Sequence, residues 1–361
     1  MDTGSVPWPI RLLGWVADYA PGLFVEIGDL ETWLMGESIK DKVIDRPVFI
    51  AGLARSGSTL LLEIAASHPD AATHKNRDFP LVHLPVLWNR LVNMMPGRDN
   101  TLKERPHADR MMVNAQSPEA MEEPIWMAFF NHLHNPSVNN ILGRHTTNRK
   151  FEDFYRDHIR KIIHIRGGAR YVSKGNYNIS RIGYLAKIFQ DARFIIPVRA
   201  PVAHISSLLR QHKRFSQIHQ ADPRTVATMR QGGHFEFGAD LRPINFGGPD
   251  LSRQMTSQDR KTSVVAWAVY WRQVHEHIHA MLESCEDIKS RAMVIRFEDK
   301  CREPEKTITS FLSFIGLEDI SIAASFAPMI TAPDYYDPGF TEDEEALIME
   351  VTSGVRENFG Y

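Results

Sequence analysis

The feature that most constrains this chain is a short apolar run that leads through a glycine-rich loop into a helical pattern. The run is Val48–Ala51, the loop is Gly52–Thr59, and the helical pattern Ser58–Ser67 stops before Pro69. A buried strand that ends in such a loop lets backbone N–H groups point at one centre, and the following helix adds the partial positive charge of its N-terminus. The segment Val48–Ser67 therefore predicts a site for a phosphate-bearing nucleotide.

Apolar runs and helical patterns alternate over the next 250 residues. Further strands are predicted at Tyr171–Lys174, Arg193–Val198 and Ala292–Arg296, and helices at Ile179–Phe189, Pro201–Phe215, 261–284 and Glu303–Ile315. Strands that alternate with helices predict an α/β fold, a three-layer parallel sheet flanked by helices and similar to the P-loop NTPases. Ligands of such sheets bind beyond the carboxyl ends of the strands.

Two regions stand apart from this alternation. Residues 1–45 are expected to be an N-terminal helical segment packed on the core, and residues 46–361 the main domain. Within that domain, 216–260 is rich in Gln, Gly, Arg and Pro, which predicts a long irregular excursion that contacts a substrate. Its candidate contact residues are Arg230, His234, Phe235, Arg242 and Arg253.

Composition narrows the class of protein. A formal net charge of −2 over 361 residues argues against a nucleic-acid partner. No run of about 18 apolar residues occurs, so no membrane span is expected. Acidic residues interrupt the apolar stretch Trp8–Leu34, which argues against a signal peptide. Two cysteines without metal-type spacing suit a reducing compartment, so a cytoplasmic location is predicted, and a homo-oligomer stays open.

The loop has the glycine spacing of a Walker A motif but not its cation. Ser58 stands where that motif has lysine, and the positive charge comes from Arg55 inside the loop. The strand Arg193–Val198 ends in Arg199 rather than in an aspartate that would hold Mg²⁺. A phosphotransferase with an altered loop is therefore an alternative, not the favoured reading.

A second anion clamp is predicted past the third strand. Arg199 follows this strand directly, and Ser207 lies eight residues further, about two helical turns into the next helix. An arginine and a hydroxyl placed in this way can hold one more phosphate group. A nucleotide phosphorylated at two separate positions would use both clamps.

The two segments GLARSGSTLL and FIIPVRAPVAHISSLL together resemble the sulfotransferases that use 3′-phosphoadenosine-5′-phosphosulfate (PAPS). The resemblance covers roughly 47–316 and is greatest to the tyrosylprotein, Golgi-type and bacterial branch. It implies that the first segment binds the 5′-phosphosulfate and the second the 3′-phosphate. The residues implied for the first role are Arg55, Ser56, Gly57, Ser58 and Thr59, and those for the second are Arg199 and Ser207.

Two weaker segments add to this resemblance. Ser173-Lys174-Gly175-Asn176 lies where that branch carries a catalytic lysine, so Lys174 and Arg55 are expected at the transferred sulfate. Arg296-Phe297-Glu298-Asp299, followed by Pro304, is similar to a strand-end segment of the family, and Phe297 is expected to border the adenine. No metal ion is needed in this scheme.

The acceptor base is the position at which the chain departs from the family. Alignment by distance from Arg55 places Asn76 where relatives carry a glutamate. Asp78, two residues on, is the predicted base, although aspartate also suits the start of the helix expected at Phe79-Pro80. The alternatives are His74, Glu122 and Glu123, and Arg77 could orient the base or contact an acidic acceptor.

The sequence thus predicts an enzyme that moves a sulfuryl group from PAPS to a hydroxyl or amine acceptor by in-line transfer. Its acceptor would be a small molecule, a glycan or a peptide. A non-catalytic protein that binds PAP, the desulfated product, is the other alternative. His275-Glu276-His277-Ile278-His279 has the pattern of a zinc site, but no third ligand follows, so it is expected to be an ordinary helix.

Overall fold

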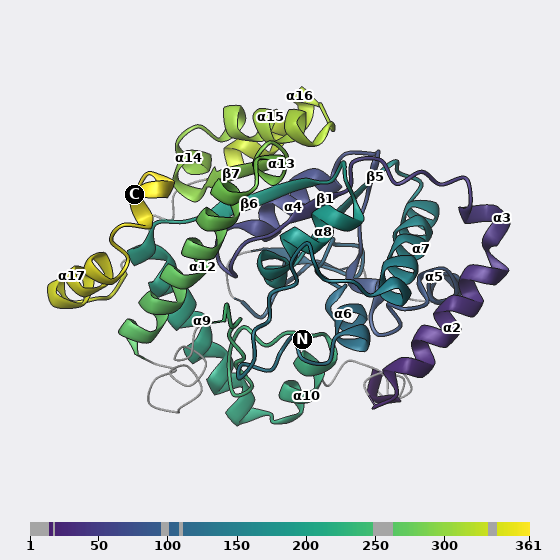
Figure 1. The fold of residues 1–361 in the computed structure, drawn as a ribbon, viewed down its shortest axis with the longest axis horizontal. Helices are drawn as coiled ribbons and strands as arrows, with labels where there is room; N and C mark the ends of the chain where they lie inside the picture. Colours follow the sequence, from purple (N-terminus) through teal and green to yellow (C-terminus); the bar gives the residue numbers. More distant parts are fainter. Residues whose placement is uncertain (1–13, 17–18, 95–100, 108–110, 248–262, 331–337) are drawn as a thin grey trace.

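A parallel sheet forms the centre of the molecule (Figure 1). The computed structural model describes residues 14–16, 19–94, 101–107, 111–247, 263–330 and 338–361. In these residues the sheet has five strands in the order β2-β5-β1-β6-β7. Their bounds are β1 Val48–Ile50, β2 Ala71–Ala72, β5 Arg170–Lys174, β6 Arg193–Val198 and β7 Ala292–Arg296. A small antiparallel pair, β3 Lys103–Glu104 and β4 Met112–Val113, lies outside it.

The four strands predicted from the sequence are confirmed, and their order brings the key loops together. β1 is central, with β5 on one side and β6 on the other, and all pair in parallel. The loop after β1, the end of β5 and the start of α9 after β6 therefore lie at one edge of the sheet. The edge strand β2 was not predicted, because two residues are too few to produce an alternating pattern.

Helices surround the sheet, and the local sequence sets where α7 begins and where α15 ends. Asn148 caps α7 by accepting a hydrogen bond from the Phe151 N–H, and Gly316 ends α15 in the left-handed conformation at φ 68°. The helices before β6 are α2 Pro21–Leu34, α3 Gly36–Ile39, α4 Ser58–Ala66, α5 Pro85–Met94, α6 Glu123–Phe129, α7 Arg149–Arg166 and α8 Ile182–Ile188. Those after it are α9 Pro201–Ala221, α10 Arg224–Gln231, α12 Val264–Ser284, α13 Glu286–Lys289, α14 Phe297–Arg302, α15 Pro304–Ile315, α16 Ile320–Phe326 and α17 Glu342–Val351. The 3₁₀ turns are η1 Asn76–Asp78, η2 Asn176–Arg181, η3 Ala327–Met329 and η4 Arg356–Phe359.

Alternate side chains of the central strand enter two different cores. Val48 and Ile50 pack with α4 and α15, whereas Phe49 packs with the residues of α7 and α8 on the opposite face. Because successive side chains of a strand point to opposite faces, a strand buried on both sides reads as a continuous apolar run. The predicted three-layer α/β architecture is confirmed.

The N-terminal helices lie beside α5 and α7, at the end of the molecule opposite α17 (Figure 1). A buried ion pair joins α2 to α7: Lys161 Nζ lies 3.2 Å from Glu31 Oε2 and donates to the Gly28 carbonyl at 2.7 Å. The other Glu31 oxygen accepts from the Leu87 N–H of α5 at 2.6 Å. One carboxylate therefore links three helices.

The predicted irregular excursion is partly helical, so that expectation is wrong for its first third. α9 continues to Ala221, and α10 covers Arg224–Gln231; only the following 232–247 is irregular among the described residues. The Gln and Arg that suggested a loop are also good helix formers, and Pro223 suits the start of a helix. Arg253, a predicted contact, lies outside the described residues.

Candidate functional site

The loop between β1 and α4 is shaped by glycine at two points. A Cβ on Gly52 would lie 2.6 Å from Pro197 Cγ, so only glycine lets β1 and β6 approach here. Gly57, at φ 88°, is the N-cap of α4, and a Cβ there would collide with the Lys300 ammonium. Arg55 also has a positive φ of 71°, which is uncommon for a residue with a side chain. The backbone of the loop is therefore tightly held, with its amides ahead of the first turn of α4.

A chain of hydrogen bonds from α12 through α9 fixes the loop. His204 donates from Nε2 to the Ala54 carbonyl at 2.9 Å and accepts from Trp271 Nε1–H at 3.2 Å. Burial keeps the pKa of His204 well below its usual value, so the ring is neutral and its donor and acceptor roles are fixed. Ser56 donates to the Leu53 carbonyl at 2.7 Å, so its hydroxyl closes the loop.

The two predicted clamps meet at this loop. Arg55 Nε donates to Ser207 Oγ at 3.3 Å, and Arg199 Nη1 donates to the Arg55 carbonyl at 3.3 Å. The Arg199 guanidinium lies over the Phe297 ring, 4.5 Å from its centroid. Residues from the loops that follow β1 and β6 and from α9 and α14 thus converge within hydrogen-bond and stacking distance. Ser58 and Thr59 are buried in the first turn of α4, and Thr59 Oγ1 accepts from Arg105 at 3.2 Å.

Sequence reasoning missed a buried cation beside this loop. Lys300, on α14, is 1% exposed, and its ammonium lies 4.7 Å from the Phe297 centroid and directly against Gly57. Burial lowers the pKa of Lys300 to about 8. Lys300 directly follows the Phe297-Glu298-Asp299 segment, and this position in the sequence was the only indication that it belongs to the site. A buried positive charge so close to Gly57 suits an anion bound at the loop.

Lys174 ends β5 at the same edge of the sheet, and it is buried. Burial lowers its pKa; the carboxylates of Glu119 and Glu236 oppose that shift, and Arg105 and Arg55 add to it. Lys174 therefore lies within electrostatic reach of the loop arginine and of two carboxylates. Neither carboxylate was a predicted site residue, because nothing in the sequence around them marks a site.

These two carboxylates are partly exposed. Glu236 is held by Asn176, whose side-chain amide donates to Oε1 at 2.7 Å. Glu119 accepts its own neighbour's N–H, that of Ala120, at 2.9 Å. Its backbone N–H donates to the His74 carbonyl at 3.1 Å, so Glu119 lies across from the segment that contains Asn76. The structure thus places Glu119 on the segment that pairs with residues 74–76, near the position at which the resemblance implied a glutamate.

Asp78, the predicted base, is fully buried. Its carboxylate accepts two hydrogen bonds from Arg166 at 2.6 Å, one from Asn89 at 3.1 Å and one from the Lys75 N–H at 3.0 Å, and it contacts His74 Nδ1 at 3.0 Å. Although burial raises the pKa of Asp78, the hydrogen bonds and charges of His74 and Arg166 hold it well below its usual value. Its assignment as the base stays a prediction, and the geometry favours a positioning role.

The alternative bases are enclosed in the same way. His74 lies between Asp78 and His158, whose Nε2 is 2.9 Å from His74 Nε2. Glu123 accepts from Arg181 Nη1 at 2.9 Å and contacts His134, and these charges lower its pKa to about 2 against the effect of burial. Glu122 accepts hydrogen bonds from three buried hydroxyls, those of Tyr155, Tyr171 and Ser173.

The histidines of the zinc-like pattern are packing residues in the structure. The His275 ring stacks on Trp271 at 3.7 Å, contacts the Trp271 carbonyl at 2.7 Å and has its pKa lowered to about 4 by burial. Among the described residues, no group of three or more His, Cys, Asp or Glu is arranged to hold a metal ion. In the same part of the chain, no helix combines the length and apolar character that crossing a bilayer requires.

Comparison with known families agrees with this geometry. The model of the sulfotransferase family matches residues 47–235, just over half of the chain. This chain belongs to the sulfotransferase family. The match begins at β1, includes both anion clamps and Lys174, and ends beyond α10. No curated protein matches the chain significantly in sequence.

Solved structures show the same fold. The crystal structure of a sulfotransferase from Mycobacterium tuberculosis H37Rv has a TM-score of 0.50 at 15% identity, covering 91% of this chain and 81% of that one. A sulfotransferase from Mycobacterium avium has a TM-score of 0.50 at 13% identity, with the same coverage of both chains. At these identities the likeness shows the fold alone.

Proposed function

We propose that this sulfotransferase uses PAPS as donor and transfers its sulfuryl group in line to a hydroxyl or amine acceptor. The observation that carries the proposal is the convergence of Arg55, Arg199 and Ser207 at the glycine loop. Two anion-binding elements this close suit one nucleotide with phosphates at both ends. The amides of the loop and the first turn of α4 would hold the 5′-phosphosulfate.

The 3′-phosphate and adenine would lie on the other side of the loop. Arg199 and Ser207 supply a cation and a hydroxyl, and Phe297 supplies an apolar ring under the Arg199 guanidinium. Lys300 adds a second buried positive charge on the same side of Gly57. A doubly charged phosphate would compensate both cations, which supports a ligand with a phosphate at this position.

In the transfer step, the acceptor oxygen forms a bond to sulfur while the bond from sulfur to the bridging oxygen of the donor breaks. Negative charge develops on the oxygen that leaves with PAP, so a nearby cation lowers the barrier. Arg55 and Lys174 are proposed for this role, because Lys174 ends β5 within electrostatic reach of Arg55. Positioning and charge supply the rate enhancement in this scheme, without a covalent intermediate.

The acceptor proton must go to a base. The carboxylate of Asp78 is fully buried and already engaged by Arg166, so we propose the partly exposed Glu119 for this role. Glu119 is partly exposed, lies within electrostatic reach of Lys174, and stands across from His74, two residues before Asn76. It would supply the carboxylate that position 76 lacks, and Glu236 would orient Asn176 and the acceptor.

The proposal is tested by incubating the protein and PAPS with a panel of phenols, sugars, alcohols and amines, and measuring PAP formation together with the sulfated product. Acceptor-dependent formation of both in equal amounts is the expected result. PAP binding without transfer to any acceptor would instead support a non-catalytic binding protein. Phosphate transfer from ATP with Mg²⁺ would favour the altered phosphotransferase.

A further inference from the structure

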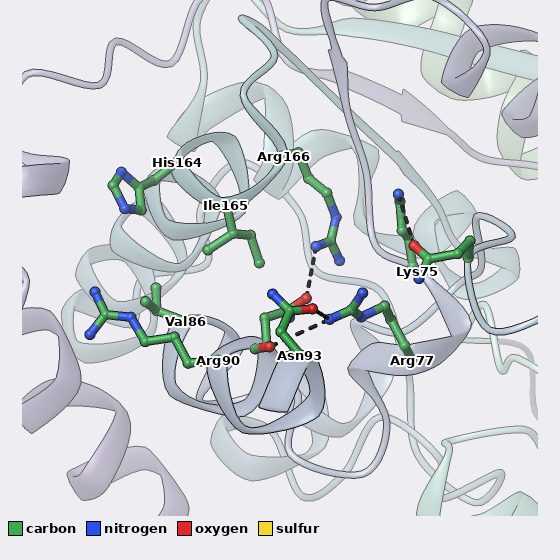
Figure 2. A pocket seen from close by; sticks show the side chains of 10 residues that line it. Lys75, Arg77, Val86, Arg90, Asn93, His164, Ile165 and Arg166 are labelled. Atoms are coloured by element: carbon green, nitrogen blue, oxygen red, sulfur yellow. Dashed lines mark hydrogen bonds between the residues drawn. The ribbon is translucent and has the colours of Figure 1, made fainter. Parts of the chain in front are cut away.

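A second cationic site lies beside the candidate transfer site. It is a cavity of about 280 Å³ between η1, the C-terminal half of α5 and the C-terminal turn of α7. Figure 2 shows the side chains of Lys75, Arg77, Arg90, His164 and Arg166 around this space. Among the described residues, no Asp or Glu lines it. So many basic groups around one cavity are expected to attract an anion.

Two of these cations, Lys75 and Arg90, contact neutral groups. The Lys75 ammonium donates to the neutral side chain of Gln116 at 3.3 Å, and Arg90 contacts the sulfur of Met35 at 3.9 Å. Arg166 is paired with Asp78, which is not itself one of the residues that line the cavity. Burial and the charges of Arg166 and Arg77 lower the pKa of Lys75, so these cations repel one another while no anion is bound.

The buried Asp78 fixes the geometry of this pocket. It holds the Arg166 guanidinium through two hydrogen bonds, and Arg166 also donates to Asn89 at 3.1 Å and to the Thr73 carbonyl at 2.9 Å. A guanidinium fixed in this way loses little conformational entropy when it binds an oxyanion. Arg90 is exposed at the opposite wall and can close on the ligand.

The pocket shares a wall with the proposed acceptor site. Gln116 lines the pocket, and Glu119, three residues on, acts on Lys174. The segments 75–76 and 114–118 are joined by the bridge between Lys75 and Pro118 and by the hydrogen bond from Asn76 Nδ2 to the Asn114 carbonyl at 3.0 Å. A molecule whose hydroxyl lies at Lys174 could therefore place an anionic end among these cations.

We propose that this pocket binds a sulfate, phosphate or carboxylate group carried by the acceptor, so that the enzyme selects anionic acceptors. The inference rests on the proposed function for the position of the acceptor hydroxyl. The proposal that the pocket binds an anion depends only on the residues that line the pocket. The two claims therefore fail separately in the following experiment.

The first arm titrates sodium sulfate into protein saturated with PAP, at constant ionic strength, by calorimetry. The double variant Lys75→Gln/Arg90→Gln removes two charges that contact the neutral side chains of Gln116 and Met35. Arg302→Gln/Lys306→Gln, two exposed cations on α14 and α15 near the opposite edge strand β7, is the matched control. Sulfate is expected to bind wild type and control equally, and the pocket variant at least about tenfold more weakly. Equal binding by all three proteins, or no binding by wild type, overturns the anion site.

The second arm compares phenol with 4-hydroxyphenylacetate as acceptors. The anionic acceptor is expected to have a KM at least about tenfold lower in wild type, and this advantage should disappear in the pocket variant while kcat with phenol stays unchanged. If sulfate binds in the pocket but the KM of the anionic acceptor is no lower than that of phenol, the claim that the pocket selects acceptors is overturned, and the pocket binds a free oxyanion. If PAP itself does not bind, the proposed function fails, and sulfate titration without PAP still tests the pocket.

Discussion

Lys300 provides a sharp test of how the nucleotide is bound. With a pKa of about 8 in the unligated protein, its ammonium is about 90% protonated at pH 7 and about 10% at pH 9. If PAP needs the protonated form, its apparent Kd rises as that fraction falls. The affinity of wild type for PAP is then expected to weaken about tenfold from pH 7 to pH 9. The charge of the 3′-phosphate changes little over this range, because its second pKa is about 6 and it is already about 90% doubly ionised at pH 7.

The assay is calorimetric titration of PAP at half-unit pH steps, with wild type, Lys300→Met and Lys306→Met. Lys300→Met is expected to bind PAP more weakly at pH 7 and to lose most of the change with pH, whereas the exposed control Lys306→Met should behave as wild type. A wild-type Kd that is constant from pH 7 to pH 9, or an equal change with pH in Lys300→Met, would refute the role of Lys300.

The stability of the unligated protein gives an independent readout of the same charge. The folded pKa of Lys300 lies below the value of 10.5 in the unfolded chain, so burial of the ammonium costs most below pH 8, and the cost declines as the pH rises toward 10.5. The shift corresponds to at most about 3 kcal/mol. Lys300→Met is therefore expected to unfold at higher denaturant concentration than wild type at pH 7, with a smaller difference near pH 10.

Two further predictions separate catalysis from stability. Glu119→Gln should lower kcat by about 100-fold or more and leave the free energy of unfolding unchanged, and a normal kcat in this variant would exclude Glu119 as the base. Asp78→Asn should lower the free energy of unfolding by about 3 kcal/mol, because it leaves the Arg166 guanidinium buried without its anion. Lys161→Met should destabilise the protein by about 3–5 kcal/mol by leaving Glu31 buried without its cation, and Lys161→Met/Glu31→Gln should recover most of the loss. Steady-state kinetics measures kcat and denaturant unfolding measures the stabilities. Equal stability of the Lys161 single and double variants would contradict the second prediction.

The sequence predicts the parts of the fold that depend on local patterns. β1 and β6 are buried on both faces, so each is a continuous apolar run that is visible in the sequence. The extension of α9 to Ala221 and the presence of α10 were missed, because Gln and Arg occur in polar helices as often as in loops. β2 owes its existence to pairing with β5, a tertiary effect that two alanines cannot reveal.

Some residues of the candidate site could be predicted from local sequence, and others could not. Arg55, Arg199 and Ser207 lie at fixed spacings from strand ends, so the order of the strands is enough to bring them together. Lys300 and Glu119 owe their places to packing: one is buried by α14 against Gly57, and the other is aligned with the His74 segment by an isolated bridge. Asp78 as the base stays a prediction; its burial and its hydrogen bond to Arg166, 88 positions away, leave no trace in the local sequence.

The central claim is that one doubly phosphorylated nucleotide occupies both clamps, and calorimetric binding of PAP without metal tests it most directly. Wild type should bind PAP tightly. Arg199→Ala should lose about 2–5 kcal/mol of binding free energy, because it removes the cation paired with the 3′-phosphate, and should bind adenosine 5′-phosphosulfate, which lacks that phosphate, as wild type does. Absence of PAP binding by wild type, or equal PAP affinity in Arg199→Ala, would contradict the account.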